Sequence, residues 1–93
     1  MTRLTRAFDK KIYIVDDDKV SHNLNGYSGD AVNKLALFEN MYDDLIASQS
    51  EISKELEKLR NEDKTHSVKF KELMARKLTN TNFLIFLKTY GLE

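Results

Sequence analysis

The feature that most constrains this chain is a periodic series of apolar residues that starts near residue 30 and runs on without a proline. Its members alternate in steps of three and four, which places them on one side of an α-helix. They are Val32, Leu35, Phe38, Tyr42, Leu45, Ile52, Leu56 and Leu59, with Gln49 at the one polar position. We therefore predict a long helix over residues 30–62, capped by Ser28 or Asp30.

The apolar series is wide in its first half and narrow in its second half. Leu37, Met41 and Ile46 widen the first half, whereas the second half is a single seam. A wide apolar face is typical of a globular core, and a narrow one is typical of a coiled coil.

The narrow seam predicts self-association, with a dimer as the expected state. A helix over residues 30–62 is about 45–50 Å long at ~1.5 Å per residue, more than the rest of a small chain can cover. The residues predicted to form this oligomer interface are Leu45, Gln49, Ile52, Leu56 and Leu59. Within it, Gln49 is expected to hydrogen-bond across a symmetric contact and to fix its register.

Before the long helix, residues 1–16 predict a β-hairpin with strands over residues 4–8 and 12–15 and a turn at residues 9–11. The second strand, Ile-Tyr-Ile-Val, is rich in β-branched and aromatic residues. Residues 17–29 hold two of the three glycines together with several asparagines and aspartates, and are predicted to form a loop.

After the long helix, a second helix is predicted over residues 65–78, capped by Thr65 or Ser67. The polar run Thr-Asn-Thr-Asn at residues 79–82 indicates a turn before a short helix over residues 82–90, which Gly91 would end. The expected fold is therefore a mainly α single domain over residues 1–93. It has an N-terminal β-hairpin and one long helix, followed by two shorter helices that run back along the long helix as a helical hairpin.

Charge is segregated along the chain although the formal net charge is zero. Segment 1–11 has four basic side chains and one acidic, a net of +3. Segment 39–63 has eight acidic side chains and three basic, a net of −5, and segment 64–78 has five basic and one acidic, a net of +4. We interpret this pattern first as self-complementarity, with the basic second helix lying beside the acidic end of the first.

The composition argues against several classes of function. With no cysteine, the chain has no thiolate metal ligand, no cysteine nucleophile and no disulfide. The consecutive acidic residues Asp16, Asp17 and Asp18 lack the spaced oxygens of a calcium loop, and neither His22 nor His66 belongs to an acid–base cluster. We expect no metal, no cofactor and no enzymatic activity. The longest apolar stretch is Phe83–Leu87, so we expect a cytoplasmic protein rather than a membrane protein.

Several segments resemble a family of small uncharacterised proteins encoded in phages and prophages of Gram-positive bacteria. The resemblance covers roughly residues 26–92. It is carried by GYSGDAVNKLA at residues 26–36, FENMYDDL at 38–45, ELEKLR at 55–60, KTHSVKFK at 64–71 and YGL at 90–92. It implies a phage origin and a bacterial host cell, but it supplies no activity and no binding residues that can be transferred to this chain.

Two classes of function remain open. The first is a protein–protein interaction module that self-associates and binds a phage or host protein, an inhibitor of a host defence enzyme being one form of it. The second is a phage factor that binds the phosphates of nucleic acid without sequence preference. The residues that would contact phosphates are Lys64, Lys69, Lys71, Arg76 and Lys77. The last helix is mostly apolar, which argues against a recognition helix that reads base edges.

Overall fold

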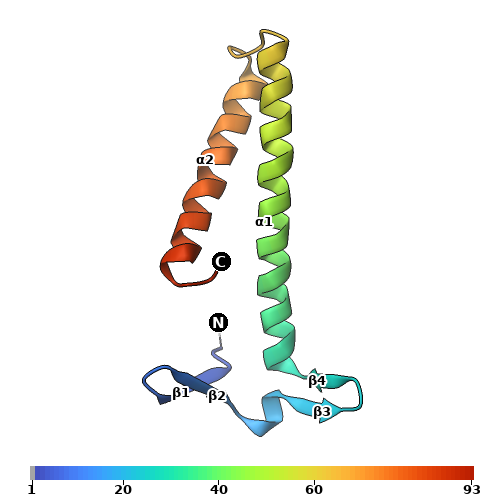
Figure 1. The fold of residues 1–93 in the computed structure, drawn as a ribbon, viewed down its shortest axis with the longest axis vertical. Helices are drawn as coiled ribbons and strands as arrows, with labels where there is room; N and C mark the ends of the chain where they lie inside the picture. Colours follow the sequence, from blue (N-terminus) through green and yellow to red (C-terminus); the bar gives the residue numbers. More distant parts are fainter. Residues whose placement is uncertain (1) are drawn as a thin grey trace. The chain divides into compact units, whose positions relative to one another are not determined.

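The computed structural model describes residues 2–93 and shows a mainly helical chain that begins with two β-hairpins (Figure 1). The elements are β1 (Thr5–Asp9), β2 (Ile12–Val15), the 3₁₀ helix η1 (Asp17–Lys19), β3 (Ser21–Asn23), β4 (Gly26–Ser28), α1 (Asp30–Asn61) and α2 (Val68–Thr89). The chain forms two compact units, one up to Tyr42 and one from Asp43 onward, and α1 continues from the first into the second.

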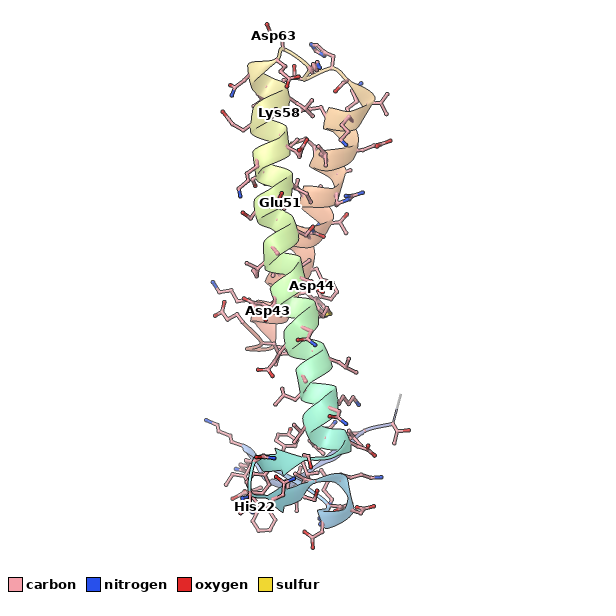
Figure 2. All side chains as sticks on the ribbon, turned by 90° about the vertical axis from the view of Figure 1, so that its right-hand side faces the viewer. His22, Asp43, Asp44, Glu51, Lys58 and Asp63 are labelled. Carbon is pink, nitrogen blue, oxygen red and sulfur yellow. The ribbon has the colours of Figure 1, made fainter. Side chains whose placement is uncertain are left out.

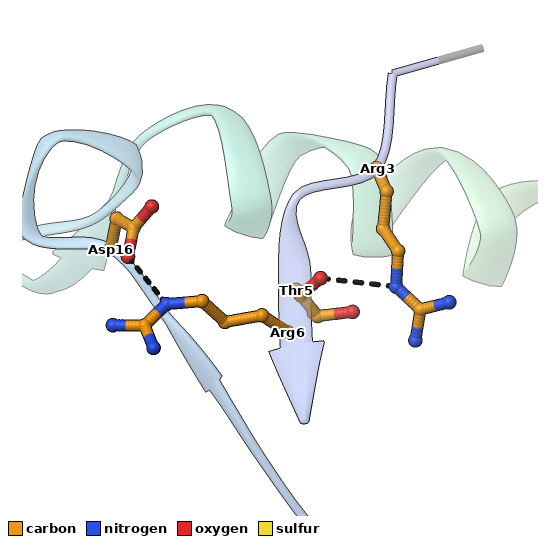
Figure 3. A network of polar contacts seen from close by, with 4 residues as sticks. All are labelled: Arg3, Thr5, Arg6 and Asp16. Carbon is orange, nitrogen blue, oxygen red and sulfur yellow. Dashed lines mark hydrogen bonds and ion pairs between the residues drawn. The ribbon is translucent and has the colours of Figure 1, made fainter. Parts of the chain in front are cut away.

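The first β-hairpin is confirmed. Strands β1 and β2 pair antiparallel, with Arg6 opposite Ile14, and the register shifts around Phe8 in a bulge. The Arg6 Nε–H donates to Asp16 Oδ1 at 3.0 Å, so a charge pair closes the open end of the hairpin (Figure 3). The Arg3 Nε–H donates to the Thr5 carbonyl oxygen at 3.0 Å, and the Arg3 guanidinium lies 5.5 Å from the centre of the Tyr13 ring. Exposed polar contacts therefore hold this hairpin.

Residues 17–29 do not form the predicted loop. They contain η1 and a second antiparallel hairpin, in which β3 and β4 pair from Ser21 and Ser28 to Asn23 and Gly26. Asn23 Oδ1 accepts a hydrogen bond from the Asn25 N–H at 2.8 Å and so shapes the two-residue turn. The strands have three residues each and no apolar alternation. The turn residues were visible in the sequence, but the strands beside them gave no periodic signal.

The start of α1 depends on Gly29 rather than on a side-chain cap. The Gly29 carbonyl accepts the first helical hydrogen bond, from the Asn33 N–H at 2.9 Å, and Gly29 has φ 122°. A Cβ at this position would lie 2.6 Å from the Lys19 carbonyl oxygen and 2.9 Å from Val20 Cα. Glycine is therefore needed both for its backbone conformation and for the close approach of residues 19–20.

The long helix agrees with the prediction within one residue and ends in a Schellman motif. Asp63 has φ 57°, the Lys64 N–H donates to the Leu59 carbonyl at 2.8 Å, and the Asp63 N–H donates to the Arg60 carbonyl at 3.1 Å. After this turn Ser67 caps α2, its Oγ accepting from the Phe70 N–H at 3.1 Å. The connection is short, so α2 runs back beside α1.

Helix α2 is continuous, which corrects the prediction of two shorter helices separated by a turn at residues 79–82. The Thr79 hydroxyl donates to the Ala75 carbonyl and the Thr81 hydroxyl to the Lys77 carbonyl, at 3.1 and 2.8 Å. The helical hydrogen bonds can persist beside these contacts, because a carbonyl oxygen has two lone pairs and can accept from a hydroxyl as well as from a backbone N–H. The C-terminal signal was correct, because Gly91 has φ 76° and follows the last turn.

The core lies between α1 and α2 in the second unit. Leu56 is fully buried, Ile52 and Leu73 are nearly so, and Leu59 and Phe70 pack against them. The Arg60 guanidinium lies 5.5 Å from the centre of the Phe70 ring and covers the end of the cluster near the connection. In the first unit, by contrast, no residue from 2 to 42 is buried.

The two positive-φ glycines of the first unit offer a matched test of the close approach at residues 19–20. Gly29→Ala should destabilise the first unit by more than Gly26→Ala, because both residues have φ near 120° but a Cβ at Gly26 would meet nothing within 4 Å. Each substitution carries a backbone cost of about 1–2 kcal/mol, and only Gly29→Ala adds a clash with backbone atoms. Amide chemical shifts of residues 17–20, which include the two neighbours of Gly29, should change for Gly29→Ala alone. Equal changes in both variants would contradict the proposed role of Gly29.

Candidate interaction surfaces of the helical hairpin

Four of the five residues predicted to form an oligomer seam contact α2 of the same chain, namely Gln49, Ile52, Leu56 and Leu59. Ile52 and Leu56 are 4% and 0% exposed because Leu73 packs on them, and Leu59 joins the same cluster. Leu45 is half-buried. The prediction assumed that a single chain offers too little surface to cover these side chains. The continuous α2 supplies that surface, so this seam needs no second copy.

Gln49 also bonds within the chain. Its Nε2–H donates to Thr81 Oγ1 at 3.0 Å and approaches the Lys77 carbonyl at 3.4 Å, while the Thr81 hydroxyl donates to the same carbonyl at 2.8 Å. These contacts determine which way the Gln49 amide is turned. If it were turned over, Oε1 would point at the Lys77 carbonyl oxygen, and both oxygens are acceptors. Beside it, the Asn80 Nδ2–H donates to Ser48 Oγ at 3.4 Å. A polar layer thus crosses the helical hairpin where both helices would otherwise present apolar residues.

One atom of this layer is left without a partner. Gln49 Oε1 is buried and accepts no hydrogen bond within residues 2–93. A buried unpaired acceptor costs folding free energy. The layer therefore defines the register of α2 against α1 at some cost in stability.

The basic side chains of α2 do not form ion pairs with α1. Within residues 2–93, no carboxylate oxygen lies within 4.0 Å of a side-chain nitrogen of Lys69, Lys71, Arg76 or Lys77. The ion pairs of α1 are instead formed along the helix itself, by Lys54 with Glu51 at 3.8 Å and by Arg60 with Glu57 at 3.6 Å. The acidic residues Asp43, Asp44 and Glu51 project from α1 (Figure 2). Topology brings the two charged helices together, but their charges are not paired at contact distance.

The fifth predicted basic residue, Lys64, differs from the other four because it has an acidic partner. Lys64 Nζ lies 2.8 Å from Glu62 Oε2 in the connection between the helices. The hydrogen bond and charge of Lys64 lower the pKa of Glu62, and Glu62 in turn raises the pKa of Lys64. The pair thus stabilises the fold above the normal pKa of a glutamate, and this contribution is lost as the pH falls through the lowered value.

A second apolar stripe runs along α2 beside the buried face. Met74, Leu78 and Ile85 are 40%, 62% and 58% exposed. Met74, Lys77, Leu78 and Thr81 line a shallow, mainly apolar hollow of about 190 Å³. Lys77 was predicted as a possible nucleic-acid contact, but the apolar hollow that it lines was not predicted. The spacing of Met74, Leu78 and Ile85 could have revealed the stripe, but the assumed turn at residues 79–82 divided it.

Aromatic side chains form a further exposed group near the end of α2. Phe83, Phe86 and Tyr90 are 44%, 62% and 70% exposed, and the rings of Phe86 and Tyr90 have centroids 5.4 Å apart. Exposed aromatic residues at helical spacing are typical anchors of protein–protein contacts.

Two polar side chains of the first unit that were considered as possible ligands or catalytic groups, Asp16 and His22, form local contacts. Asp16 pairs with Arg6, and Asp17 and Asp18 lie in η1. The His22 ring lies against Tyr27 with centroids 4.5 Å apart, across the β3–β4 pair. Over residues 2–93, no three histidine or acidic side chains come together in an arrangement that could hold a metal ion. On α2, by contrast, exposed apolar side chains stand beside basic side chains without acidic partners among the described residues.

Comparison of the chain with models of protein families, with curated proteins and with solved structures gave no match. Within the described residues, neither helix combines the length and the apolar character needed to cross a lipid bilayer.

Replacing Gln49 with leucine should stabilise the helical hairpin by about 1 kcal/mol. The substitution removes the unpaired Oε1, while the Thr81 hydroxyl keeps its bond to the Lys77 carbonyl. Thr81→Val is the matched control, because it removes the acceptor of the Gln49 amide and should destabilise the hairpin by about 1–3 kcal/mol. Urea titrations followed by circular dichroism measure both effects. A lower free energy of unfolding for Gln49→Leu would show that the amide contributes more than it costs.

Proposed function

We propose that this chain is a small protein–protein interaction module that self-associates and has no catalytic activity. The observation that carries the proposal is the balance between buried and exposed apolar side chains. Only Ile52, Leu56, Leu73 and Leu87 are buried among residues 2–93, whereas far more large apolar side chains are exposed along both helices and the hairpins. Surfaces of this kind mark sites where another chain binds.

The resemblance to small phage and prophage proteins supports a partner from a phage or from its Gram-positive host. An inhibitor of a host defence enzyme is one protein of this class. Such an inhibitor would need a rigid binding surface but no active site. The helical hairpin, with its exposed stripe on α2, offers such a surface.

A pull-down from a Gram-positive host tests the module, with lysates taken before and after prophage induction. The bait is the whole chain, and the comparison bait is Leu78→Ser/Ile85→Ser, which removes exposed apolar surface without touching the core. Ala75→Ser, at an exposed position of the same helix, is the matched control. We expect one protein to be retained by the wild-type and Ala75→Ser baits and lost from the double variant. Identical patterns from all three baits would exclude α2 as the binding surface.

A second candidate function is nucleic-acid binding through α2. It is favoured by one observation, the absence of carboxylate partners for Lys69, Lys71, Arg76 and Lys77 within residues 2–93. Unpaired basic side chains on one helix are able to contact successive phosphates. The exposed apolar residues on the same helix have no role in such contacts, which is why we place this candidate second.

Charge reversal separates the two candidates. If α2 is a protein-binding surface, Lys69→Glu/Arg76→Glu should lower the free energy of unfolding by less than about 1 kcal/mol at low salt. The loss should vanish near 1 M salt, where screening extends only ~3 Å. The wild-type chain should also leave the fluorescence anisotropy of a labelled oligonucleotide of about 20 nucleotides unchanged at about 50 mM salt. Micromolar binding that disappears in the double variant would make nucleic-acid binding the better assignment.

A further inference from the structure

The exposed stripe on α2 has the spacing of a helix-packing seam. Met74, Leu78, Thr81 and Ile85 follow one another in steps of four, three and four, which is the alternation that faces a partner helix in a coiled coil. This stripe borders the buried face, where Leu73 and Leu87 lie, and Thr81 belongs to both because its hydroxyl accepts from Gln49 of α1. Helix α2 therefore has two packing faces, of which α1 covers one.

The hollow on this stripe has the form of a hole that receives one side chain. Its lining residues Met74, Lys77, Leu78 and Thr81 stand at positions i, i+3, i+4 and i+7 of one helix. Four residues at this spacing surround the inserted side chain of a neighbouring helix in knobs-into-holes packing. The residues that line the hollow all belong to α2, so it is open to a side chain from another helix.

We propose that a second copy of the chain fills this hole with Ile46 from its α1. Ile46 is an apolar side chain in the second unit and is 45% exposed, so it is available to a partner. Its neighbours on the helix are Asp43 at i−3 and Ser50 at i+4, both exposed. The small serine permits close approach of the partner helix, and the aspartate places a carboxylate beside the inserted side chain.

Charge complementarity favours a second copy as the occupant. Lys77 lines the hole, and it has no acidic partner within residues 2–93. Asp43 is also outside every ion pair of the described residues. Insertion of Ile46 from a second copy brings Asp43 of that copy toward Lys77. The chain thus carries both the apolar and the charged halves of one contact.

Two-fold symmetry makes the contact occur twice. Each copy offers one Ile46 and one hole, so a closed dimer fills both holes. This inference rests on the proposed interaction module, because it names the partner and the surface of that module. It replaces the seam predicted from the sequence, which α2 of the same chain covers.

The test uses two variants that each break one half of the contact. Ile46→Glu places a carboxylate in the apolar hole, and Leu78→Lys places an ammonium in its lining. Light scattering at tens of micromolar should give a dimer for the wild-type chain and a monomer for each variant alone. An equimolar mixture should recover a dimer, because one hole of the mixed pair is unaltered and the other brings the introduced carboxylate against the introduced ammonium.

Ala47→Glu and Thr79→Lys are the matched controls. They introduce the same charges at exposed neighbouring positions outside the proposed contact and should leave the dimer intact. Helical circular dichroism verifies that each variant folds. If a charged variant loses helicity, Ile46→Ser and Leu78→Ser replace the pair, and each should weaken dimerisation at least tenfold.

The outcomes separate this inference from the proposed function. If light scattering gave a monomer for the wild-type chain, a second copy could not be the occupant of the hole. The interaction module would still be supported if the pull-down captured a protein that the Leu78→Ser/Ile85→Ser bait lost. A wild-type dimer that withstands both Ile46→Glu and Leu78→Lys would show that the copies meet elsewhere. Failure of the mixture to recover a dimer would overturn the pairing of Ile46 with this hole.

Discussion

The burial of Leu56 against Ile52 and Leu73 is the interaction on which the helical hairpin depends. Leu56 has no exposed surface, and removal of such a side chain to alanine costs about 2–5 kcal/mol in proteins generally. The contact is possible because the chain reverses within a few residues, with Asp63 in the left-handed region and Ser67 capping the next helix. Backbone geometry at the connection therefore determines which residues of α2 reach the core.

The polar layer restricts the same packing to one register. A leucine at residue 49 would accept several positions of α2, because apolar side chains interdigitate in more than one way. The Gln49 amide is bonded only when Thr81 and the Lys77 carbonyl lie opposite it. Ser48 and Asn80 repeat this requirement. With α2 held in this register and Leu73 packed on α1, Met74, Leu78 and Ile85 stay exposed.

Sequence periodicity predicted the long helix and the first hairpin because each follows from a local pattern, apolar steps of three and four in α1 and the β-branched run Ile12–Val15 in β2. The continuity of α2 could not be obtained in this way. The low helix propensity of residues 79–82 is local, whereas the bonds of Asn80 and Thr81 to α1 join residues 32 positions apart. The oligomer interface was mispredicted for a related reason. An apolar seam on one helix shows that a partner helix is needed, but it does not show whether that helix belongs to the same chain. For the stripe on α2, the described residues offer no partner helix. Helix α1 already packs on the buried face of α2, and these residues form no third α-helix.

Buried apolar side chains are distributed very unequally over the chain, and this affects how much a bound partner would stabilise each unit. The second unit has a small core, while residues 2–42 have two short hairpins and no buried side chain. Two-stranded hairpins without a covered face are marginally stable in water. Phe8, Ile12 and Tyr13 are more than half exposed on the first hairpin, and Leu24 is fully exposed at the turn of the second. A partner that covers such residues binds the folded form alone and raises its stability through mass action. For this chain, binding and folding are therefore expected to be coupled most strongly in the N-terminal unit, where the chain itself supplies the least apolar burial.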